Sequence, residues 1–554
     1  MQQQFLTISG ITISNFKSIG GEQRIDFRPI TLLFGPNSAG KSTVLQALQF
    51  MRELLERGNV DPDRTIAGGE SVDLGGFRNL VPHHDVGKPV TIRVDFTPGD
   101  DPLPRYGQII VDEEESSDLR KDLADNGIGA VESAWIKIAC RWDEETHQPW
   151  ITRYEIGLNG QRMAEISTQP LHVPCITFLD FDHPIFDRFD ETEGVTAEDQ
   201  GGMRAELKAM ANNIFLDPDS ISPVAGIQLW LDSEDSPIPD FSQPLPIADD
   251  IVDVEDRPTF ELLSLIVSQI LVGTGALLLR ELRKIRYLGP IRSVPPRNFV
   301  PRTSPDEARW ASGLAAWDLL YSRYDHQAQS GDAFIKDVSR RMSAADELGL
   351  GYSIELAQVY ELREDSILMS HLRAIAADRD SYSGELFTDP LRRELARLQP
   401  RRKLILQDEI NDTEVKPHDI GVGISQVIPV VVGALDAKCS LFAVEQPELH
   451  IHPRIQCNLG DVFASEAGKG DGRVFLIETH SEHLILRLLR RIRETTENEL
   501  PPGKPPLTPD QVAVYYVQGG ADGMQVTEIP ITPDGDFTKQ WPDGFFEERE
   551  EELF

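Results

Sequence analysis

The residues best suited to chemistry form the segment GPNSAGKS at 35–42, which has the spacing G-x-x-x-x-G-K-[ST] of a phosphate-binding loop. The apolar run PITLLF precedes it, and apolar residues at helical spacing follow it. The glycines let backbone N–H groups turn toward phosphate oxygens, and the helix start adds the positive end of its dipole. The segment therefore predicts binding of a nucleoside triphosphate through Gly35, Asn37, Ser38, Ala39, Gly40, Lys41, Ser42 and Thr43.

Two side chains of this loop have separate expected roles. Lys41 can reach the β- and γ-phosphates, and the Ser42 hydroxyl can ligate Mg²⁺. Far downstream, the run CSLFAVE at 439–445 has the length and composition of a strand buried on both faces. It ends in Glu445, where a magnesium-coordinating carboxylate belongs. We therefore expect ATP and Mg²⁺ as cofactors, with Ser42 and Glu445 at the metal.

The next residue, Gln446, occupies the position of the catalytic carboxylate, and an amide cannot take up a proton. Losing a positioned acid–base group is worth about 3 to 5 kcal/mol of barrier. Three interpretations are open: Gln446 orients the attacking water, Glu448 supplies the carboxylate, or the register is offset by one and Glu445 is catalytic. We favour slow hydrolysis with Gln446 and Glu448 both near the γ-phosphate. ATP binding without hydrolysis is the alternative.

Two further segments lie close to this strand in the sequence. DIGVGISQVIPVVVGAL at 419–435 places a glycine-containing turn and Ser425-Gln426 directly before an apolar helix. Free N–H groups and a helix dipole at such a start attract an anion, as they do at the phosphate loop. RVFLIETH at 473–480 predicts a second buried parallel strand, which ends at His480.

Seven segments occur in an order that resembles one family: ISNFKS, GPNSAGKS, YLGPIR, VGISQVIP, VEQPELHIHP, ETHSEH and WPDGFF. The family is the bacterial OLD-like and RecF-like ABC-type ATPases, related to SMC heads, that carry an uncharacterised C-terminal segment. The resemblance covers roughly 5–170 and 286–554. It implies that Gly423, Ser425 and Gln426 contact the γ-phosphate held by an opposite subunit, and that His480 is the switch histidine.

The resemblance also implies partners. Such ATPases act as homodimers or higher homo-oligomers in DNA repair or anti-phage defence, often beside a separate effector such as a nuclease or toxin. A TOPRIM nuclease needs a further domain after the ATPase, and only 74 residues follow His480. We therefore expect no nuclease activity in this chain.

The order of motifs predicts an α/β fold: an ABC/SMC-type P-loop ATPase head with an N-terminal antiparallel β subdomain, a helical subdomain and an irregular insertion. Short β-rich runs fill the first 170 residues, whereas 171–257 is rich in Pro, Asp and Ser and lacks periodicity. The expected units are an N-terminal ATPase lobe at 1–170, an insertion with helices at 171–285, a helical subdomain at 286–418 and a C-terminal ATPase lobe at 419–554.

Charge limits the expected partners. The chain has 91 acidic and 54 basic side chains, a formal net charge of −37, which repels nucleic acid as a whole. DNA binding by this chain therefore stays open, and it would need a local basic patch. The candidates are 280–292, 392–403 and 487–493.

The sequence also bears on location. The first residues lack a secretory signal, and four scattered cysteines fit a reducing cytoplasm. The run LLSLIVSQILVGTGALLL at 262–279 approaches the length of a membrane span, but polar residues and glycines interrupt it. We expect a buried core helix there, and a cytoplasmic protein without a membrane partner.

Overall fold

The computed structural model describes residues 5–69, 72–107, 128–168, 173–186, 208, 229–230, 236–247, 257–297, 299–302, 307–322, 330–377, 393, 396–398, 401–520 and 523–539. Much of the expected insertion, the basic segment at 392–400 and the terminal WPDGFF lie wholly or largely outside these ranges.

A six-stranded sheet forms the centre of the molecule, in the order β10-β14-β15-β3-β16-β17. The first five strands are parallel, and the last closes the sheet as an antiparallel hairpin. Every residue of the three central strands is buried, as parallel strands covered on both faces require. The strands are β10 (Arg286–Leu288), β14 (Leu441–Glu445), β15 (Val474–Glu478), β3 (Ile30–Phe34), β16 (Val512–Gly520) and β17 (Gly523–Glu528).

The two faces of this sheet pack into different cores. Leu33 and Leu476 point into the core that holds α1 (Ser42–Arg57). Their neighbours Leu32 and Ile477 point into the core on the other face. The period-two alternation of side chains along each strand thus builds a three-layer unit. The helices of the second core are α12 (Val422–Leu435), α13 (Pro453–Ala467) and α14 (Glu482–Thr496).

An eight-stranded antiparallel sheet lies beside α1, in the order β2-β1-β4-β5-β6-β7-β8-β9, and confirms the expected N-terminal β subdomain. It runs past the expected boundary at 170, because β8 and β9 continue it. These two short strands lie among Pro- and Asp-rich residues that hid them in the sequence. The strands are β1 (Thr7–Ser14), β2 (Gln23–Asp26), β4 (Val90–Thr97), β5 (Ala134–Asp143), β6 (Gln148–Leu158), β7 (Gln161–Ser167), β8 (Cys175–Leu179) and β9 (Leu229–Trp230).

The long apolar run forms α5 (Arg257–Ser268), a π-helical turn and α6 (Thr274–Leu282). Among the described residues, the helix Phe260–Leu282 alone has the length and hydropathy of a membrane span, and 83% of its apolar window is buried inside the protein. The Tyr154 hydroxyl donates to the Leu271 carbonyl at 2.9 Å, so the π turn is bonded to the antiparallel sheet. The expected core helix is confirmed.

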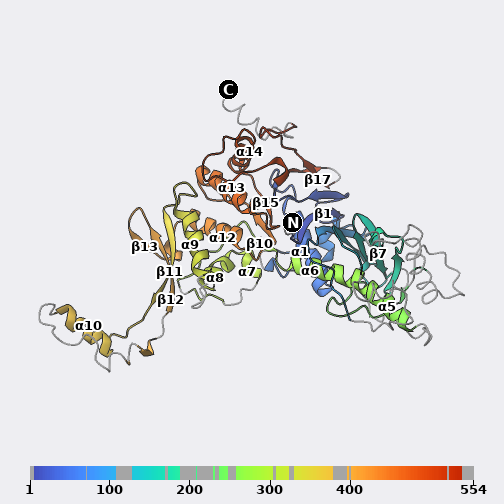
Figure 1. The fold of residues 1–554 in the computed structure, drawn as a ribbon, viewed down its shortest axis with the longest axis horizontal. Coiled ribbons are helices and arrows are strands. Elements are labelled where there is room, and N and C mark those ends of the chain that lie inside the picture. The colour runs from blue at the N-terminus through green and yellow to red at the C-terminus, as the bar shows by residue number, and fades with distance from the viewer. Residues whose placement is uncertain are drawn as a thin grey trace, which may run out of the picture.

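The section 286–418 differs from the expected helical subdomain. Its first strand, β10, belongs to the six-stranded sheet, and β11 (Tyr352–Val359), β12 (Arg401–Asp408) and β13 (Thr413–Val415) form a separate antiparallel sheet. The β11–β12 ribbon leads away from the body toward α10 (Figure 1). The helices of the section 286–418 are α7 (Ala308–Ala311), α8 (Leu314–Ser322), α9 (Ser330–Ser343) and α10 (Ile367–Ala377).

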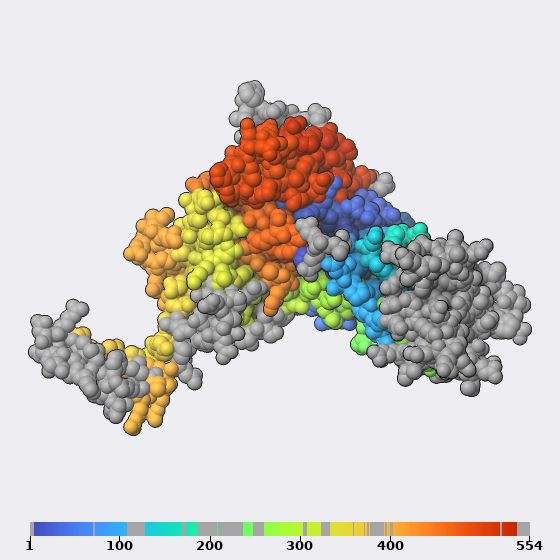
Figure 2. Space-filling view, in the orientation of Figure 1, coloured from blue at the N-terminus to red at the C-terminus, as the bar shows by residue number. Residues whose placement is uncertain are grey.

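Both ends of the chain meet in the centre. In Figure 2 the C-terminal segment lies directly against the N-terminal segment, red against blue. Strand β3 is bonded to β15 on one side and to β16 on the other: its residue Ile30 pairs with Phe475 and with Val512, both near the other end of the sequence. Short helical turns elsewhere are α2 (Phe77–Leu80) and the 3₁₀ turns Pro82–His84, Pro184–Phe186, Pro417–Asp419 and Pro509–Gln511.

Candidate ATP and magnesium site

The phosphate loop joins β3 to α1 and depends on two glycines. Gly35 has φ +146°, and a Cβ there would stand 2.0 Å from the Val517 carbonyl oxygen. Gly40 has φ +99°, and a Cβ there would stand 2.2 Å from the Ser18 hydroxyl oxygen. Side chains are therefore excluded twice, by backbone conformation and by the close approach of neighbouring segments. The predicted glycine positions have the backbone shape that a phosphate cradle requires.

Lys41 lies folded against its own loop. Its Nζ donates to the carbonyls of Gly35 and Pro36, each at 3.0 Å, and stands 3.9 Å from Glu478 Oε1. Burial lowers the pKa of Lys41, while Glu478 and two other carboxylates of the site, Glu448 and Glu445, oppose this shift. The ammonium group is thus held at the loop among acidic groups.

Ser42 donates from Oγ to Glu478 Oε2 at 2.8 Å. The sequence had paired Ser42 with Glu445, so Glu478 is a site residue that the prediction missed. Glu445 and Glu478 are register partners on adjacent parallel strands, and both side chains emerge at the same edge of the sheet. Ser42 also lowers the pKa of Glu445, which places both carboxylates within reach of its hydroxyl. The sequence signal was present, because each strand ends in glutamate.

The carboxylates Glu445, Glu448 and Glu478 have raised pKa values, because nearby positive charge does not offset their burial. Burial, followed by the nearby Glu478, raises the pKa of Glu445 to about 7. Burial also raises the pKa of Glu478 and of Glu448. Within the described ranges no three His, Cys, Asp or Glu side chains converge as a metal site. Mg²⁺, however, takes only one or two carboxylates besides phosphate and water oxygens, so Ser42 with Glu445 and Glu478 fits it.

The residues after β14 turn back toward β15. Gln446 has φ +45°, and its N–H donates to the Glu478 carbonyl at 2.7 Å. Glu448 accepts hydrogen bonds from the Thr479 hydroxyl and the His480 N–H, both at 2.7 Å. The structure therefore brings the predicted residues Gln446, Glu448 and His480 to the same edge of the sheet as Lys41.

His480 presents an unsatisfied ring nitrogen. Its Nε2 is buried and has no hydrogen-bond partner among the described residues. Burial, and secondarily the charge of Lys41, lowers the pKa of His480, which favours the neutral ring. A neutral imidazole beside the phosphate loop can still offer one N–H to an oxygen.

Two residues of YLGPIR, which sequence reasoning used only as a family motif, hold the end of β14. The Tyr287 hydroxyl donates to Glu445 Oε1 at 2.8 Å. The Arg292 guanidinium donates to the carbonyls of Glu445, at 2.6 Å, and of Gln446, at 3.2 Å. Burial lowers the pKa of Arg292 to about 10, although Glu448 and Glu445 favour its charged form. Nothing in the composition of this short motif indicated these contacts.

The helix α12 begins at Val422, and two predicted site residues lie near its start. Ser425 is 1% exposed, and its hydroxyl donates to the Val422 carbonyl. Gln426 is 6% exposed and exchanges two hydrogen bonds with the Arg292 backbone. Both side chains are therefore engaged within the chain, and their contact with a γ-phosphate held by a second protomer stays a prediction. Gly423 lies against the His450 carbonyl, and the backbone at 421–423 forms the accessible helix start.

The C-terminal hairpin of β16 and β17 packs against the phosphate loop. The Met524 N–H donates to the Ser18 carbonyl at 2.6 Å, and Met524 Sδ would stand 2.8 Å from a Cβ at Gly40. On the next strand, Val517 lies against Gly35. Residues 512–528 therefore belong to the nucleotide-binding unit itself.

Three family models match the chain. A model described as an AAA domain matches residues 11–129, and one described as "AAA domain, putative AbiEii toxin, Type IV TA system" matches 279–487. The chain is therefore similar to AAA domains in these two sections. A third model, "Protein of unknown function (DUF3696)", matches 507–554, which includes the hairpin behind the phosphate loop.

Solved structures with a similar arrangement include SMC head domains. The Thermotoga maritima head shares 9% identity, with a TM-score of 0.32, and the match covers 95% of this chain and 99% of that one. The Pyrococcus yayanosii head, with a coiled coil and joint, shares 10%, with a TM-score of 0.36, over 99% and 100%. The Pyrococcus furiosus head, bound to the C-terminal domain of ScpA, shares 11%, with a TM-score of 0.36, over 95% and 97%. A comparison with curated proteins finds no match.

The strand order and the phosphate loop themselves establish the α/β P-loop fold. The predicted α/β fold with an N-terminal antiparallel β subdomain is confirmed.

Proposed function

We propose that this chain is an ATP-dependent switch in which two protomers enclose ATP and Mg²⁺ and hydrolyse the nucleotide slowly. The observation that carries the proposal is the gathering of Lys41, Ser42 and three carboxylates at one edge of the parallel sheet. Phosphoryl transfer depends on positioning and charge stabilisation, and these are the groups that supply both.

Each side chain has a task in this scheme. When nucleotide binds, Lys41 would leave the carbonyls of its own loop for a phosphate oxygen, and Ser42 would hold Mg²⁺ with the carboxylates at the strand ends. Bound Mg²⁺ supplies neutralisation of the phosphate charge. Glu448, fixed by two hydrogen bonds, accepts a proton from the attacking water, and Gln446 orients that water.

The second protomer is proposed to dock on the start of α12. The backbone N–H groups at 421–423 lie at an accessible helix start, and Val422 is 58% exposed. The first N–H groups of a helix have no intrahelical partner, so they can bind an anion. In this arrangement the γ-phosphate of one protomer meets the helix start of the other, and hydrolysis releases the dimer.

ATP binding and phosphate release test the site. Lys41→Ala is expected to lose ATP binding, because no other ammonium group is described at the loop. The wild type should release phosphate slowly, Gln446→Glu roughly 10-fold or more faster, and Glu448→Gln more slowly still than the wild type. Equal ATP affinity of Lys41→Ala and the wild type would contradict the assignment.

A second candidate is a scaffold that binds ATP without turning it over. The amide at Gln446 favours it, since the main chain there is held by Glu478 and the side chain cannot accept a proton. Such a scaffold would bind ATP, show no phosphate release as wild type, and gain release only in Gln446→Glu. The same set of assays thus separates the two functions.

The cellular role is proposed to be anti-phage defence in the cytoplasm, with a separate nuclease or toxin as effector. The description of one matching model as a putative AbiEii toxin of a type IV toxin–antitoxin system supports this, and DNA repair is the competing role. Phage challenge of cells that carry the gene with its neighbours, as wild type and as Lys41→Ala, tests the proposal. Protection that survives Lys41→Ala would contradict it.

A further inference from the structure

We propose that Glu478 has two successive roles at the ATP site: it holds the Ser42 hydroxyl before nucleotide binds, and it then faces Mg²⁺ together with Ser42. The inference rests on the proposed function and deepens it, because it changes which carboxylate governs magnesium. Sequence reasoning gave that role to Glu445, which ends the neighbouring strand.

The first support is direct contact. One carboxylate oxygen of Glu478 accepts the Ser42 hydroxyl at 2.8 Å, and the other stands 3.9 Å from Lys41 Nζ. Glu478 is 6% exposed, so these contacts are shielded from water. The two side chains that must reach the phosphates and the metal therefore both contact this one carboxylate.

The second support is the different attachment of Glu445. One of its carboxylate oxygens accepts the Tyr287 hydroxyl, and Tyr287 stands on β10, at the far edge of the sheet from the phosphate loop. Its carbonyl accepts the Arg292 guanidinium, which fixes the backbone. Glu445 is thus shared between Tyr287 at the far edge of the sheet and Ser42 of the loop, whereas the Glu478 carboxylate stands against both Ser42 and Lys41.

The third support is the sign of the charge. Without Mg²⁺, the Glu478 carboxylate repels incoming phosphates and occupies Lys41 and Ser42, so it opposes ATP binding. With Mg²⁺, the same carboxylate becomes a favourable neighbour of a divalent cation. Removing its charge should therefore strengthen ATP binding in one condition and weaken it in the other.

Calorimetric titration with ATP, in Mg²⁺ and separately in EDTA, tests this directly. Compared with the wild type, Glu478→Gln should bind ATP roughly 10-fold tighter in EDTA and roughly 10-fold weaker in Mg²⁺. Glu445→Gln is the comparison variant: it keeps an oxygen for Tyr287 and should change the affinity in EDTA much less. An unchanged Mg²⁺ enhancement in Glu478→Gln, with its loss in Glu445→Gln, would overturn the inference.

Two further variants distinguish a direct effect on ATP binding from a folding defect. Ser42→Ala removes the other partner of the contact, and combined with Glu478→Gln it should give less than the sum of the two single effects in EDTA. Glu478→Asp keeps the charge and should retain part of the Mg²⁺ enhancement. If the effects of Ser42→Ala and Glu478→Gln on ATP affinity in EDTA are additive, the Ser42–Glu478 contact does not control binding. If the wild type binds no ATP in either condition, the proposed function fails; if it binds with Mg²⁺ enhancement and Glu478→Gln matches it, this inference alone fails.

Discussion

Glu445 links burial at a single residue to a measurable pH dependence. Its folded pKa is raised to about 7, against 4.5 for an ordinary glutamate, so between these values the folded chain binds more protons than the unfolded chain. Stability therefore falls as the pH rises from about 4.5 to about 7. Glu445→Gln should stabilise the protein by about 3 kcal/mol at pH 8 and by little at pH 4. Urea denaturation in EDTA measures this, and an equal gain at both values would contradict it.

Gly35 gives a second prediction for a single residue. Gly35→Ala places a Cβ 2.0 Å from the Val517 carbonyl oxygen on a backbone with φ +146°, so loop and hairpin must separate. The expected cost is about 3 kcal/mol or more, with loss of ATP binding. Gly58→Ala is the matched control, because Gly58 also has positive φ but open space around it, and about 1 kcal/mol is expected. Thermal unfolding compares the two, and equal shifts would rule out the clash.

Sequence reasoning found the residues whose role depends on local spacing. The loop from Gly35 to Ser42 is one continuous motif, so its chemistry could be predicted from it. Glu478, Tyr287 and Arg292 act through strand register between segments that are distant in the sequence, and no local pattern encodes that register. The burial of Ser425 could not be predicted for a similar reason, since a short motif does not show which face of a helix is buried.

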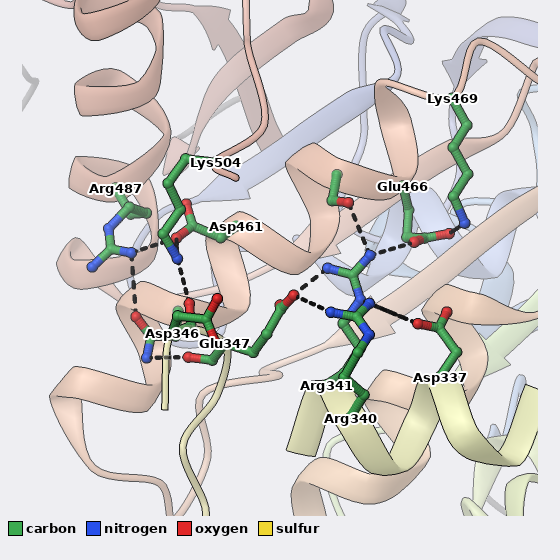
Figure 3. A network of polar contacts seen from close by, with 12 residues as sticks. Asp337, Arg340, Arg341, Asp346, Glu347, Asp461, Glu466, Lys469, Arg487 and Lys504 are labelled. Atoms are coloured by element: carbon green, nitrogen blue, oxygen red, sulfur yellow. Dashed lines mark hydrogen bonds and ion pairs between the residues drawn. The ribbon is translucent and has the colours of Figure 1, made fainter. Parts of the chain in front are cut away.

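Among the elements, ion pairs join α9, which packs on the β11–β12 ribbon, to α13, which follows the site strand β14. Arg341 on α9 donates to Glu466 on α13 (Figure 3) and to the neighbouring Ser465. Arg473 also binds Glu466. Glu466 is fully buried, so its charge depends on these partners. The network places α9, which packs on β11, in direct contact with the helix after β14.

The neighbouring residues Arg341 and Arg340 test this network. Arg341→Ala should cost about 3 kcal/mol, because it removes a partner from a buried carboxylate. Arg340→Ala should cost about 1 kcal/mol, because the Arg340 side chain is 51% exposed in its pairs with Asp337 and Glu347, and Glu347 keeps Arg341 as a partner. Both changes remove an arginine from the same helix, so the difference in urea midpoint isolates burial. Equal midpoints would show that the network adds nothing beyond a surface pair.

The elements that could be predicted were those with long, uniform patterns. Strands β3, β14 and β15 were visible as apolar runs, and the helix at 260–282 as an apolar stretch. The β11–β12 ribbon was not, because its two strands are separated by more than 40 residues and pair only through tertiary structure. Its section was therefore taken as helical.

At the scale of the whole molecule, the central sheet draws strands from all three family matches. β14 and β15 come from the second matched section and β16 from the third, while β3 comes from the first. The section matched by the model of unknown function therefore contains β16 and β17. These strands form the edge of the central sheet that packs against the phosphate loop. No single section contains the whole site.

Net charge leads to a prediction for the proposed dimer. Each protomer carries a formal charge of −37, so two copies repel one another as they approach. Salt screens this repulsion over about 10 Å at 0.1 M, whereas the enclosed nucleotide and metal are shielded by protein. With ATP and Mg²⁺, the dimer of Glu448→Gln should therefore become tighter as salt rises from about 0.05 M to about 0.3 M. Analytical ultracentrifugation measures this, with Lys41→Ala as the monomeric control. A dimer that weakens over this range would instead be held mainly by ion pairs between protomers, and the accessible start of α12 would not be its main contact.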